Sequence, residues 1–217
     1  MLGSIQEHLQ FLLLAFSSVF FIVDPIATIP TFLALTTHTE LSERRHLAKR
    51  AAWTCFLVLS GFALGGTLIF KMFGITLPAF RIAGGLIIIL IGLDMVQARR
   101  SQTKETPSET LEAMAKDDVG IIPLGVPMLA GPGSISTVMA LMAQSASWQH
   151  SALIIAVLAL TAFLSYWILA AADRVGRRMG ETGIHVLTRF MGLLLMAIAV
   201  QFILTGLTAA GFGPGHK

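Results

Sequence analysis

The sequence predicts an all-α transmembrane protein of six spans, built as two inverted-topology three-helix repeats whose first and fourth helices are discontinuous. Three observations support this: the composition, the spacing of the apolar runs, and a set of motifs that occurs twice. Of 217 residues, 55% are hydrophobic and only 12% are charged, and the mean hydropathy is +0.78. An ordinary soluble domain carries about 25% charged residues. This chain therefore has too few polar side chains to cover a globule in water.

Long apolar runs separated by short charged segments define the spans, because a helix needs about 20 mostly apolar residues to cross the hydrocarbon core. The first run begins without the positive segment and cleavage site of a signal peptide, so we expect it to stay in the protein. The predicted spans cover residues 9–36, 52–70, 79–98, 121–143, 152–171 and 187–208.

The basic residues predict the topology. Twelve of the 15 lie between spans one and two, three and four, or five and six, or, for Arg189, in the first turn of span six. By the positive-inside rule these loops are cytoplasmic, which places both termini on the non-cytoplasmic side of a bacterial inner membrane. The sequence pI of 9.4 is thus a topology signal, and no nucleic acid partner is expected. The twelve residues are Arg44, Arg45, Lys49, Arg50, Arg99, Arg100, Lys104, Lys116, Arg174, Arg177, Arg178 and Arg189.

Two pairs of motifs indicate an internal repeat. Pro25, in DPIATIP, is followed 107 residues later by Pro132, in GPGSIST. Arg81 opens RIAGG and Arg189 opens RFMGL, 108 residues later. Self-similarity at a fixed spacing is the signature of a repeat. Because each unit has three spans, the second must enter the membrane from the opposite side, as in many secondary transporters.

The repeat gives three segments. Residues 1–98 form the first three-span repeat, residues 99–120 form an acidic and basic cytoplasmic linker, and residues 121–217 form the second repeat. A short helix from Ser108 to Lys116, with Ser108 as its N-cap, is expected inside the linker.

The first span should break at its Asp-Pro pair. Proline lacks an amide hydrogen and disfavours helical geometry in the residue before it, so the helix should stop near Val23. A second half-helix can restart with Asp24 as N-cap and Pro25 at its first position. In the fourth span, the prolines and glycines of IIPLGVPMLAGPGS predict a break at Gly131, with Pro132 opening the next half-helix.

Two breaks at corresponding positions predict one central substrate site. Half-helix N-termini offer free amides to an anionic group such as a carboxylate, and Asp24 could hold a cation, an ammonium group or a proton. The alternative is that Asp24 only caps a helix and the prolines only kink it. Hydroxyl groups that follow the two breaks could coordinate an ion or substrate, or could equally satisfy freed backbone groups. They belong to Thr28, Thr31, Ser134, Ser136 and Thr137. The predicted substrate-binding residues are Asp24, Pro25, Thr28, Gly131, Pro132, Gly133 and Ser134.

Four further polar residues in the spans are candidates for gating or coupling. Arg81 and Arg189 either gate the site or anchor their helices by reaching to the headgroups. Asp94 is either functional or paired with the arginines that follow it. Gln201 is expected to face the bundle centre, where a helix–helix hydrogen bond is the simpler role.

Small residues in two other spans predict close helix packing. They are Gly61, Gly65, Gly66, Gly84 and Gly85. The single cysteine and the six histidines show no metal-ligand spacing, so neither a metal nor a cofactor is expected.

Four stretches of the chain resemble the MarC family of bacterial integral membrane proteins. They are DPIATIPTFLALT, GITLPAFRIAGGLIIILIGLDM, PLGVPMLAGPGSIS and TRFMGLLLMAIAVQFILTGL. The resemblance implies six spans with discontinuous first and fourth helices, and ion-coupled transport of small neutral amino acids such as glycine or alanine. Many members look like NPIG where this chain has Asp24, which makes the site ionisable. Gly125 replaces an alanine, a change expected to loosen the fourth span.

These observations favour a secondary transporter that works by alternating access, coupled to Na⁺ or H⁺. An uncoupled channel or a lipid translocase could use the same broken helices. An enzyme is not expected, because only Asp24 lies deep in a span and no paired catalytic group accompanies it. The expected partners are a small-molecule substrate and membrane lipid, with a homo-oligomer left open.

Overall fold

The computed structural model describes residues 2–36, 39–97, 119–145 and 147–212, and every regular element in these ranges is helical. The predicted all-α class is therefore confirmed. Most of the predicted linker, including the short helix expected in it, lies outside the described residues. The elements are α1 (Leu2–Val23), α2 (Ile29–Leu35), α3 (Leu41–Phe73), α4 (Leu77–Val96), the wide-turn segment η1 (Gly120–Leu129), α6 (Pro132–Ala143), α7 (Trp148–Ala170) and α8 (Ala172–Ala209).

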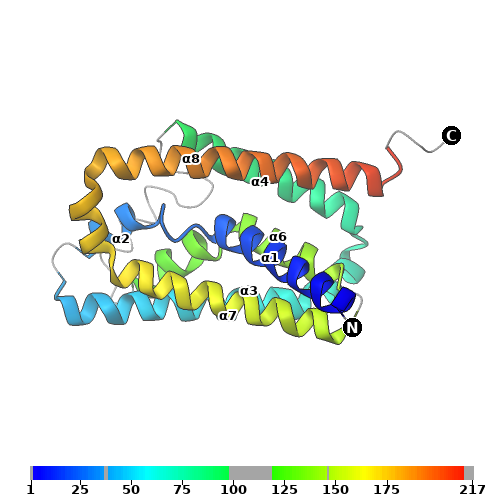
Figure 1. The fold of residues 1–217 in the computed structure, drawn as a ribbon, viewed down its shortest axis with the longest axis horizontal. Helices are drawn as coiled ribbons and strands as arrows, with labels where there is room; N and C mark the ends of the chain where they lie inside the picture. The colour runs from blue at the N-terminus through cyan, green and yellow to red at the C-terminus, as the bar shows by residue number, and fades with distance from the viewer. Residues whose placement is uncertain (1, 37–38, 98–118, 146, 213–217) are drawn as a thin grey trace.

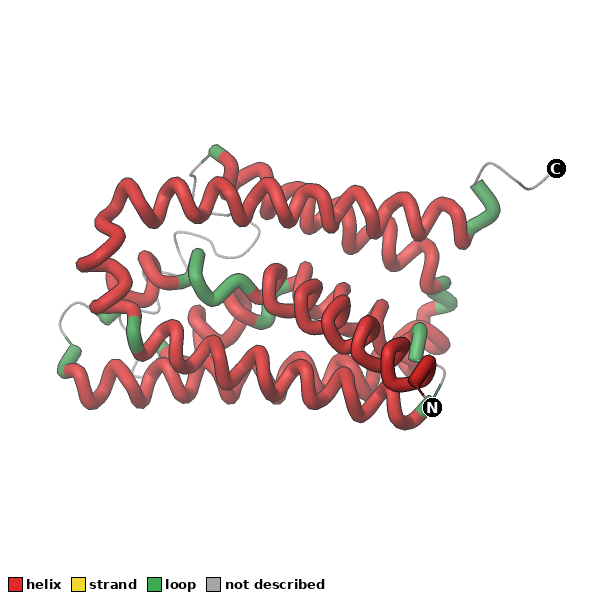
Figure 2. Tube along the Cα trace, viewed as in Figure 1, coloured by secondary structure: helices red, strands yellow, loops and turns green. Residues whose placement is uncertain are grey.

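The helices pack in three layers (Figure 1). One outer layer is the pair α4 and α8, and the other is the pair α3 and α7. The middle layer holds α1 and α6, which contact each other, and each of them also contacts both outer layers. Both interruptions of the middle layer, one after α1 and one before α6, are seen as loop segments inside the bundle in Figure 2.

Four helical stretches within the described residues are long and apolar enough to cross a membrane: Leu41–Gly66, Leu77–Val96, Trp148–Ala170 and Thr182–Ala209. A fifth candidate is the pair η1 and α6, which bends by 59° at its break. The first predicted span contains a shorter apolar helix, Leu9–Val23. The chain is thus an integral membrane protein with several spans.

Two apolar clusters hold the middle layer in place. Val19 and Val23 of α1 belong to the cluster shared with α3, α6 and α7. Ile22, on another face of the same helix, belongs to the cluster shared with α4 and α8. The end of α1 is therefore packed from both sides.

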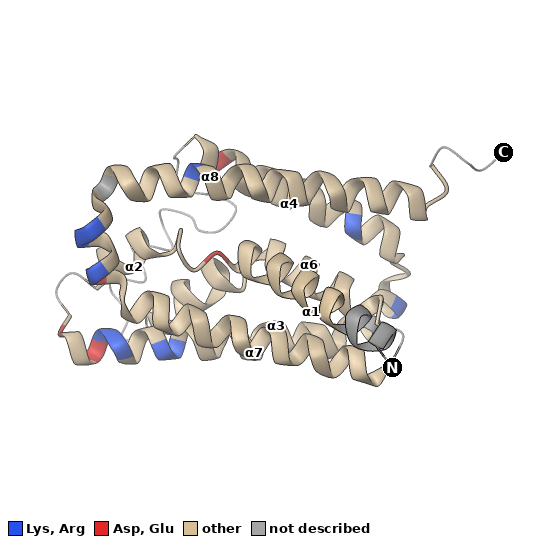
Figure 3. Ribbon diagram, viewed as in Figure 1, with Lys and Arg blue, Asp and Glu red and all other residues tan. Residues whose placement is uncertain are grey.

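Basic residues gather at one end of the bundle, where α3 begins and α7 ends (Figure 3). We call this the basic end, and its residues are Arg44, Arg45, Lys49, Arg50, Arg174, Arg177 and Arg178. Figure 1 shows α1 beginning and α8 ending at the opposite end.

The two outer layers are connected once at each end of the bundle. At the end opposite the basic end, residues 74–76 link α3 to α4. At the basic end, α7 passes into α8 at Ala171, and α8 is kinked at Gly180, whose φ of 62° favours glycine. The first turns of α8 therefore cross between the layers, where Gly176 contacts Leu33 of α2.

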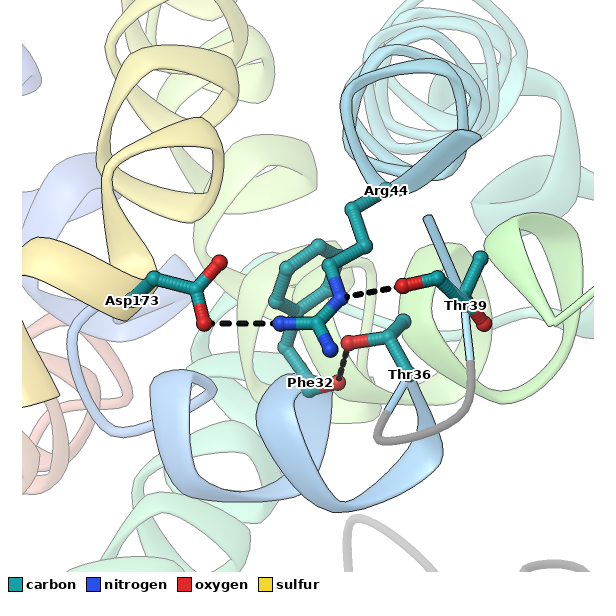
Figure 4. A network of polar contacts seen from close by, with 5 residues as sticks. All are labelled: Phe32, Thr36, Thr39, Arg44 and Asp173. Atoms are coloured by element: carbon teal, nitrogen blue, oxygen red, sulfur yellow. Dashed lines mark hydrogen bonds and ion pairs between the residues drawn. The ribbon is translucent and has the colours of Figure 1, made fainter. Parts of the chain in front are cut away.

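An ion pair fastens this crossing. The Arg44 Nη1 atom donates to Asp173 Oδ1 at 2.7 Å, and Arg44 Nε donates to the Thr39 carbonyl at 2.9 Å (Figure 4). The Thr36 hydroxyl donates to the Phe32 carbonyl at 2.7 Å and ends α2 beneath the guanidinium. The start of α3 is thus joined to the start of α8.

Close backbone contact joins α4 to α8. A Cβ atom on Gly92 would lie 2.9 Å from the Gly192 carbonyl oxygen, and one on Gly192 would lie 2.8 Å from the Gly92 oxygen. A Cβ atom on Gly85 would likewise lie 2.8 Å from the Ala199 carbonyl oxygen. The predicted role of Gly84 and Gly85 in close helix packing is confirmed. The same role is wrong for Gly61 and Gly65, which have nothing within 4 Å because their helix face points outward.

We expect Gly192→Ala to destabilise the protein by about 1 to 3 kcal/mol, because the new methyl group meets a backbone oxygen that cannot rotate away. The matched control is Gly61→Ala, which adds the same methyl group in open space and should be neutral or stabilising. The apparent melting temperature of the detergent-solubilised protein measures both. Equal melting temperatures for the two variants would contradict the close contact.

The Arg44–Asp173 pair should show a coupling energy of about 0.5 to 1 kcal/mol, because both side chains are partly exposed and solvent screens the pair. A double-mutant cycle with Arg44→Gln and Asp173→Asn, followed by unfolding in SDS, measures it. Strictly additive single effects would mean that the contact contributes nothing to stability.

Candidate functional site at two helix breaks

The first break is centred on Asp24. The predicted stop near Val23 is confirmed, since α1 ends there. Asp24 has a φ of 48°, in the left-handed region, and is fully buried. Its Oδ1 accepts a hydrogen bond from the Ala27 amide at 3.2 Å, and its carbonyl accepts one from the Thr28 hydroxyl at 3.2 Å. Asp24 therefore closes a turn of the backbone.

The second half-helix begins later than the sequence predicts. The prediction placed Pro25 at its first position, but residues 25–28 form turns and α2 begins at Ile29. Pro30 explains the shift. In a helix that started at Pro25, Pro30 would be an interior residue with no amide to donate. Beginning at Ile29 places Pro30 in the first turn, where a missing amide costs nothing.

The second break precedes α6, where it was predicted. Gly131 is the extended N-cap and Pro132 is the first residue of the helix. Upstream, η1 contains two residues with extended dihedral angles, Ile122 and Val126. Each stands directly before a proline, whose ring disfavours the helical region for the preceding residue. The whole segment is therefore irregular.

The two breaks lie side by side. A Cβ atom on Gly133, in the first turn of α6, would lie 3.5 Å from Ile22 Cγ2 in the last turn of α1. On its other side the same position meets Ile91 Cδ1 at 3.3 Å. Ile22 is two residues from Asp24, so the predicted substrate-binding residues of both breaks share one region of the middle layer.

Most of these residues are buried. Asp24, Pro25, Thr28, Gly131, Gly133 and Ser134 are buried, and Pro132 is half-buried. Three hydroxyls satisfy carbonyls at the breaks: Thr28 bonds Asp24, Ser134 bonds the Leu129 oxygen at 2.9 Å, and Thr137 bonds the Gly133 oxygen at 2.9 Å. These contacts correspond to the backbone-satisfying role, which was one of the two interpretations.

Two contacts near the site were missed from the sequence. Ser136 packs against Gly84, where a Cβ atom would lie 2.9 Å from Ser136 Cβ, so the glycine permits α4 to pack closely on α6. Gly125 was expected to loosen the fourth span. Instead, a Cβ atom there would lie 2.6 Å from Thr54 Cβ, so the glycine permits tight packing on α3.

Arg81 is the buried member of the four gating candidates. Its residue exposure is 8%, and it lies at the α4–α8 contact, where a Cβ atom on Gly206 would be 3.4 Å from Arg81 Cβ. Within the described ranges its guanidinium makes no hydrogen bond or ion pair. A cation with no protein partner among the described residues is suited to an anionic ligand.

The other three candidates lie elsewhere. Arg189 is exposed on α8. Asp94 is half-buried near the end of α4, and the arginines proposed to pair with it lie outside the described residues. The expectation that Gln201 faces the bundle centre is wrong: its side chain is exposed, and Nε2 donates to Thr205 Oγ1 one turn along α8 at 3.3 Å. No group of three or more His, Cys, Asp or Glu side chains within the described residues could hold a metal ion.

Spanning helices around two buried, side-by-side backbone breaks define a polytopic integral membrane protein with discontinuous helices in its interior. Comparison with known proteins gives the family. A family profile, the MarC family of integral membrane proteins, matches residues 9–210, and the chain belongs to this family.

Relatives cover nearly the whole chain. A UPF0056 membrane protein of Methanocaldococcus jannaschii is 42% identical over 202 residues, which span 93% of this chain and 98% of the relative. The UPF0056 membrane protein YvbG of Bacillus subtilis is 35% identical over 91% of this chain and 94% of its own length. YhcE of Escherichia coli is 32% identical over 92% of each chain. No solved structure matches.

Proposed function

We propose that this protein is a secondary transporter, and not an enzyme, that moves small neutral amino acids such as glycine or alanine by alternating access, driven by an Na⁺ or H⁺ gradient. The observation that carries the proposal is the pair of buried breaks that meet between the outer layers. Non-helical backbone at membrane depth is tolerated only where protein buries it or where it lines a wet cavity. Discontinuous helices at the interface of two repeats form the substrate sites of many transporters.

The chemistry at the breaks suits a zwitterion. The first amides of a helix have no acceptor within it, and α6 begins with Gly131 as an N-cap that provides no side-chain bond. The amides of Gly133 and Ser134 would bind the substrate carboxylate, supported by the positive end of the helix dipole. The buried Asp24 carboxylate would bind the ammonium group or the coupling cation. The small residues at the break favour a substrate with a small side chain.

The packing supports a six-span inverted repeat. Each contact in the outer layers joins corresponding helices of the two halves, α3 with α7 and α4 with α8, and the broken elements adjoin in the middle. Close backbone contacts join α4 of the first repeat to α8 of the second, so movement of this layer against the α3–α7 layer would expose the site to each side in turn. The basic end would face the cytoplasm, and both termini the opposite side of the inner membrane.

Uptake of radiolabelled glycine and alanine into proteoliposomes, with and without sodium and proton gradients, tests the function. We expect gradient-driven uptake by the wild type and its loss or decoupling in Asp24→Asn, which removes the ionisable group but keeps the shape. Asp94→Asn, in the other acidic span position, should retain coupling.

Two outcomes would contradict the proposal in different ways. If the wild type transports neither amino acid under any gradient, the substrate class is wrong. If flux is independent of every gradient and of Asp24, an uncoupled channel or a lipid translocase explains the breaks better.

Arg81 provides a second test. Arg81 is 8% exposed as a residue and its guanidinium has no protein partner within the described residues, so an anionic group of the substrate would stabilise it. We expect Arg81→Gln to lower the initial uptake rate at subsaturating substrate about tenfold, the order for one charged hydrogen bond, and Arg81→Lys to retain part of it. Arg189→Gln, at the exposed corresponding position, is the matched control and should change the rate less than twofold. If Arg81→Gln and Arg189→Gln changed the uptake rate equally, Arg81 would have no specific role in transport.

A further inference from the structure

A groove between α3 and α7 lies away from the two breaks. It encloses a cavity of about 540 Å³, within the range of small-molecule sites. Trp53 and Phe163 are 54% and 57% exposed, so the groove opens on the outer face of this helix pair. Its lining consists of Lys49, Ala52, Trp53, Phe56, Ala159, Ala162, Phe163 and Tyr166.

The groove changes character along its length. The helices run antiparallel, since α3 begins where α7 ends (Figure 1). Lys49 and Tyr166, the residues nearest those two ends, provide an ammonium and a phenol group at the basic end. Further along, Phe56 and the alanines offer only apolar surface. The lining therefore has one polar, positively charged end and one apolar end.

The charged end matches the position of lipid headgroups. Arg45 is one turn before Lys49 on α3, so the two exposed cations share a helix face and repel each other. An anion between them would relieve this repulsion. Trp53 and Tyr166 are the residue types that concentrate at the membrane interface, with their rings at headgroup level. The buried alanines of the lining, Ala52 and Ala162, leave space for a chain to lie between the helices.

We propose that this groove is a binding site for an anionic phospholipid of the leaflet at the basic end. The headgroup phosphate contacts Lys49 and Arg45, and an acyl chain lies along Trp53, Phe56 and Phe163. Basic pockets between spanning helices on the cytoplasmic side are suited to such headgroups. The site is distinct from the breaks, and it stands whether or not the protein moves amino acids.

Native mass spectrometry of the purified full chain, titrated with phosphatidylglycerol or phosphatidylcholine of the same acyl chains, tests the site. We expect the wild type to bind one phosphatidylglycerol more tightly than phosphatidylcholine. Lys49→Gln should weaken phosphatidylglycerol binding about fivefold, the order for one basic residue near an anionic lipid, and leave phosphatidylcholine binding unchanged. Ala159→Phe, at an exposed groove position, should weaken both lipids by filling the acyl part.

Each variant has a matched control. Lys71→Gln removes an exposed lysine at the far end of the same helix, and Ala83→Phe adds a ring at an exposed alanine of α4. Both should bind lipid as the wild type does. Equal affinity for the two lipids, or wild-type binding by Lys49→Gln and Ala159→Phe, would overturn the proposal. So would a stable dimer whose two copies cross-link through a cysteine placed at Trp53, because a second copy would then cover the groove.

Discussion

The structure depends on one constraint: a backbone amide or carbonyl inside the bilayer must find its partner within the protein. This chain interrupts two helices and then meets that constraint locally. Asp24 accepts the Ala27 amide, and the hydroxyls of Thr28 and Ser134 bond carbonyls at the two breaks. The polar side chains around the breaks are therefore structural, and in the proposed transporter a substrate would exchange with such bonds. The outer layers, whose helices are continuous through the bundle core, supply the surfaces that bury this region.

The interior is divided between rigid contacts and adjustable ones. The α4–α8 layer is joined by backbone-to-backbone approach at Gly85, Gly92 and Gly192, so it should move as one body. Where α1 and α6 meet each other and the α4–α8 layer around Gly133, the contacts are made by flexible aliphatic side chains, namely Ile22, Ile88 and Ile91. Side chains of this kind can repack when layers slide. This distribution agrees with a mechanism in which whole layers shift around the breaks.

Local chemistry made much of the fold predictable. Proline geometry and apolar run length predicted the end of α1, the break at Gly131 and the helix start at Pro132, because each depends on a few neighbouring residues. The predicted start of α2 was wrong because it depends on Pro30 as well as on Pro25, and a helix that begins at Ile29 places Pro30 in its first turn. The outward orientations of Gly61, Gly65 and Gln201, and the Arg44–Asp173 and Gly84–Ser136 contacts, depend on how distant helices rotate against each other. The spacing of residues along the chain does not predict that rotation.

The two connections between the outer layers are of very different length. Residues 74–76 form a three-residue link at one end, whereas at the basic end the chain runs through the crossing helix from Ala172 to the kink at Gly180. The short link keeps the two outer layers at a nearly fixed separation. The longer connection can bend at Ala171 and at Gly180, so it allows the layers to move apart. The two ends of the bundle therefore differ in how far the outer layers can separate, even where the two repeats correspond in sequence. A wedge-shaped opening, pivoting about residues 74–76 and widest beside the crossing helix, is the motion that this tethering permits most readily.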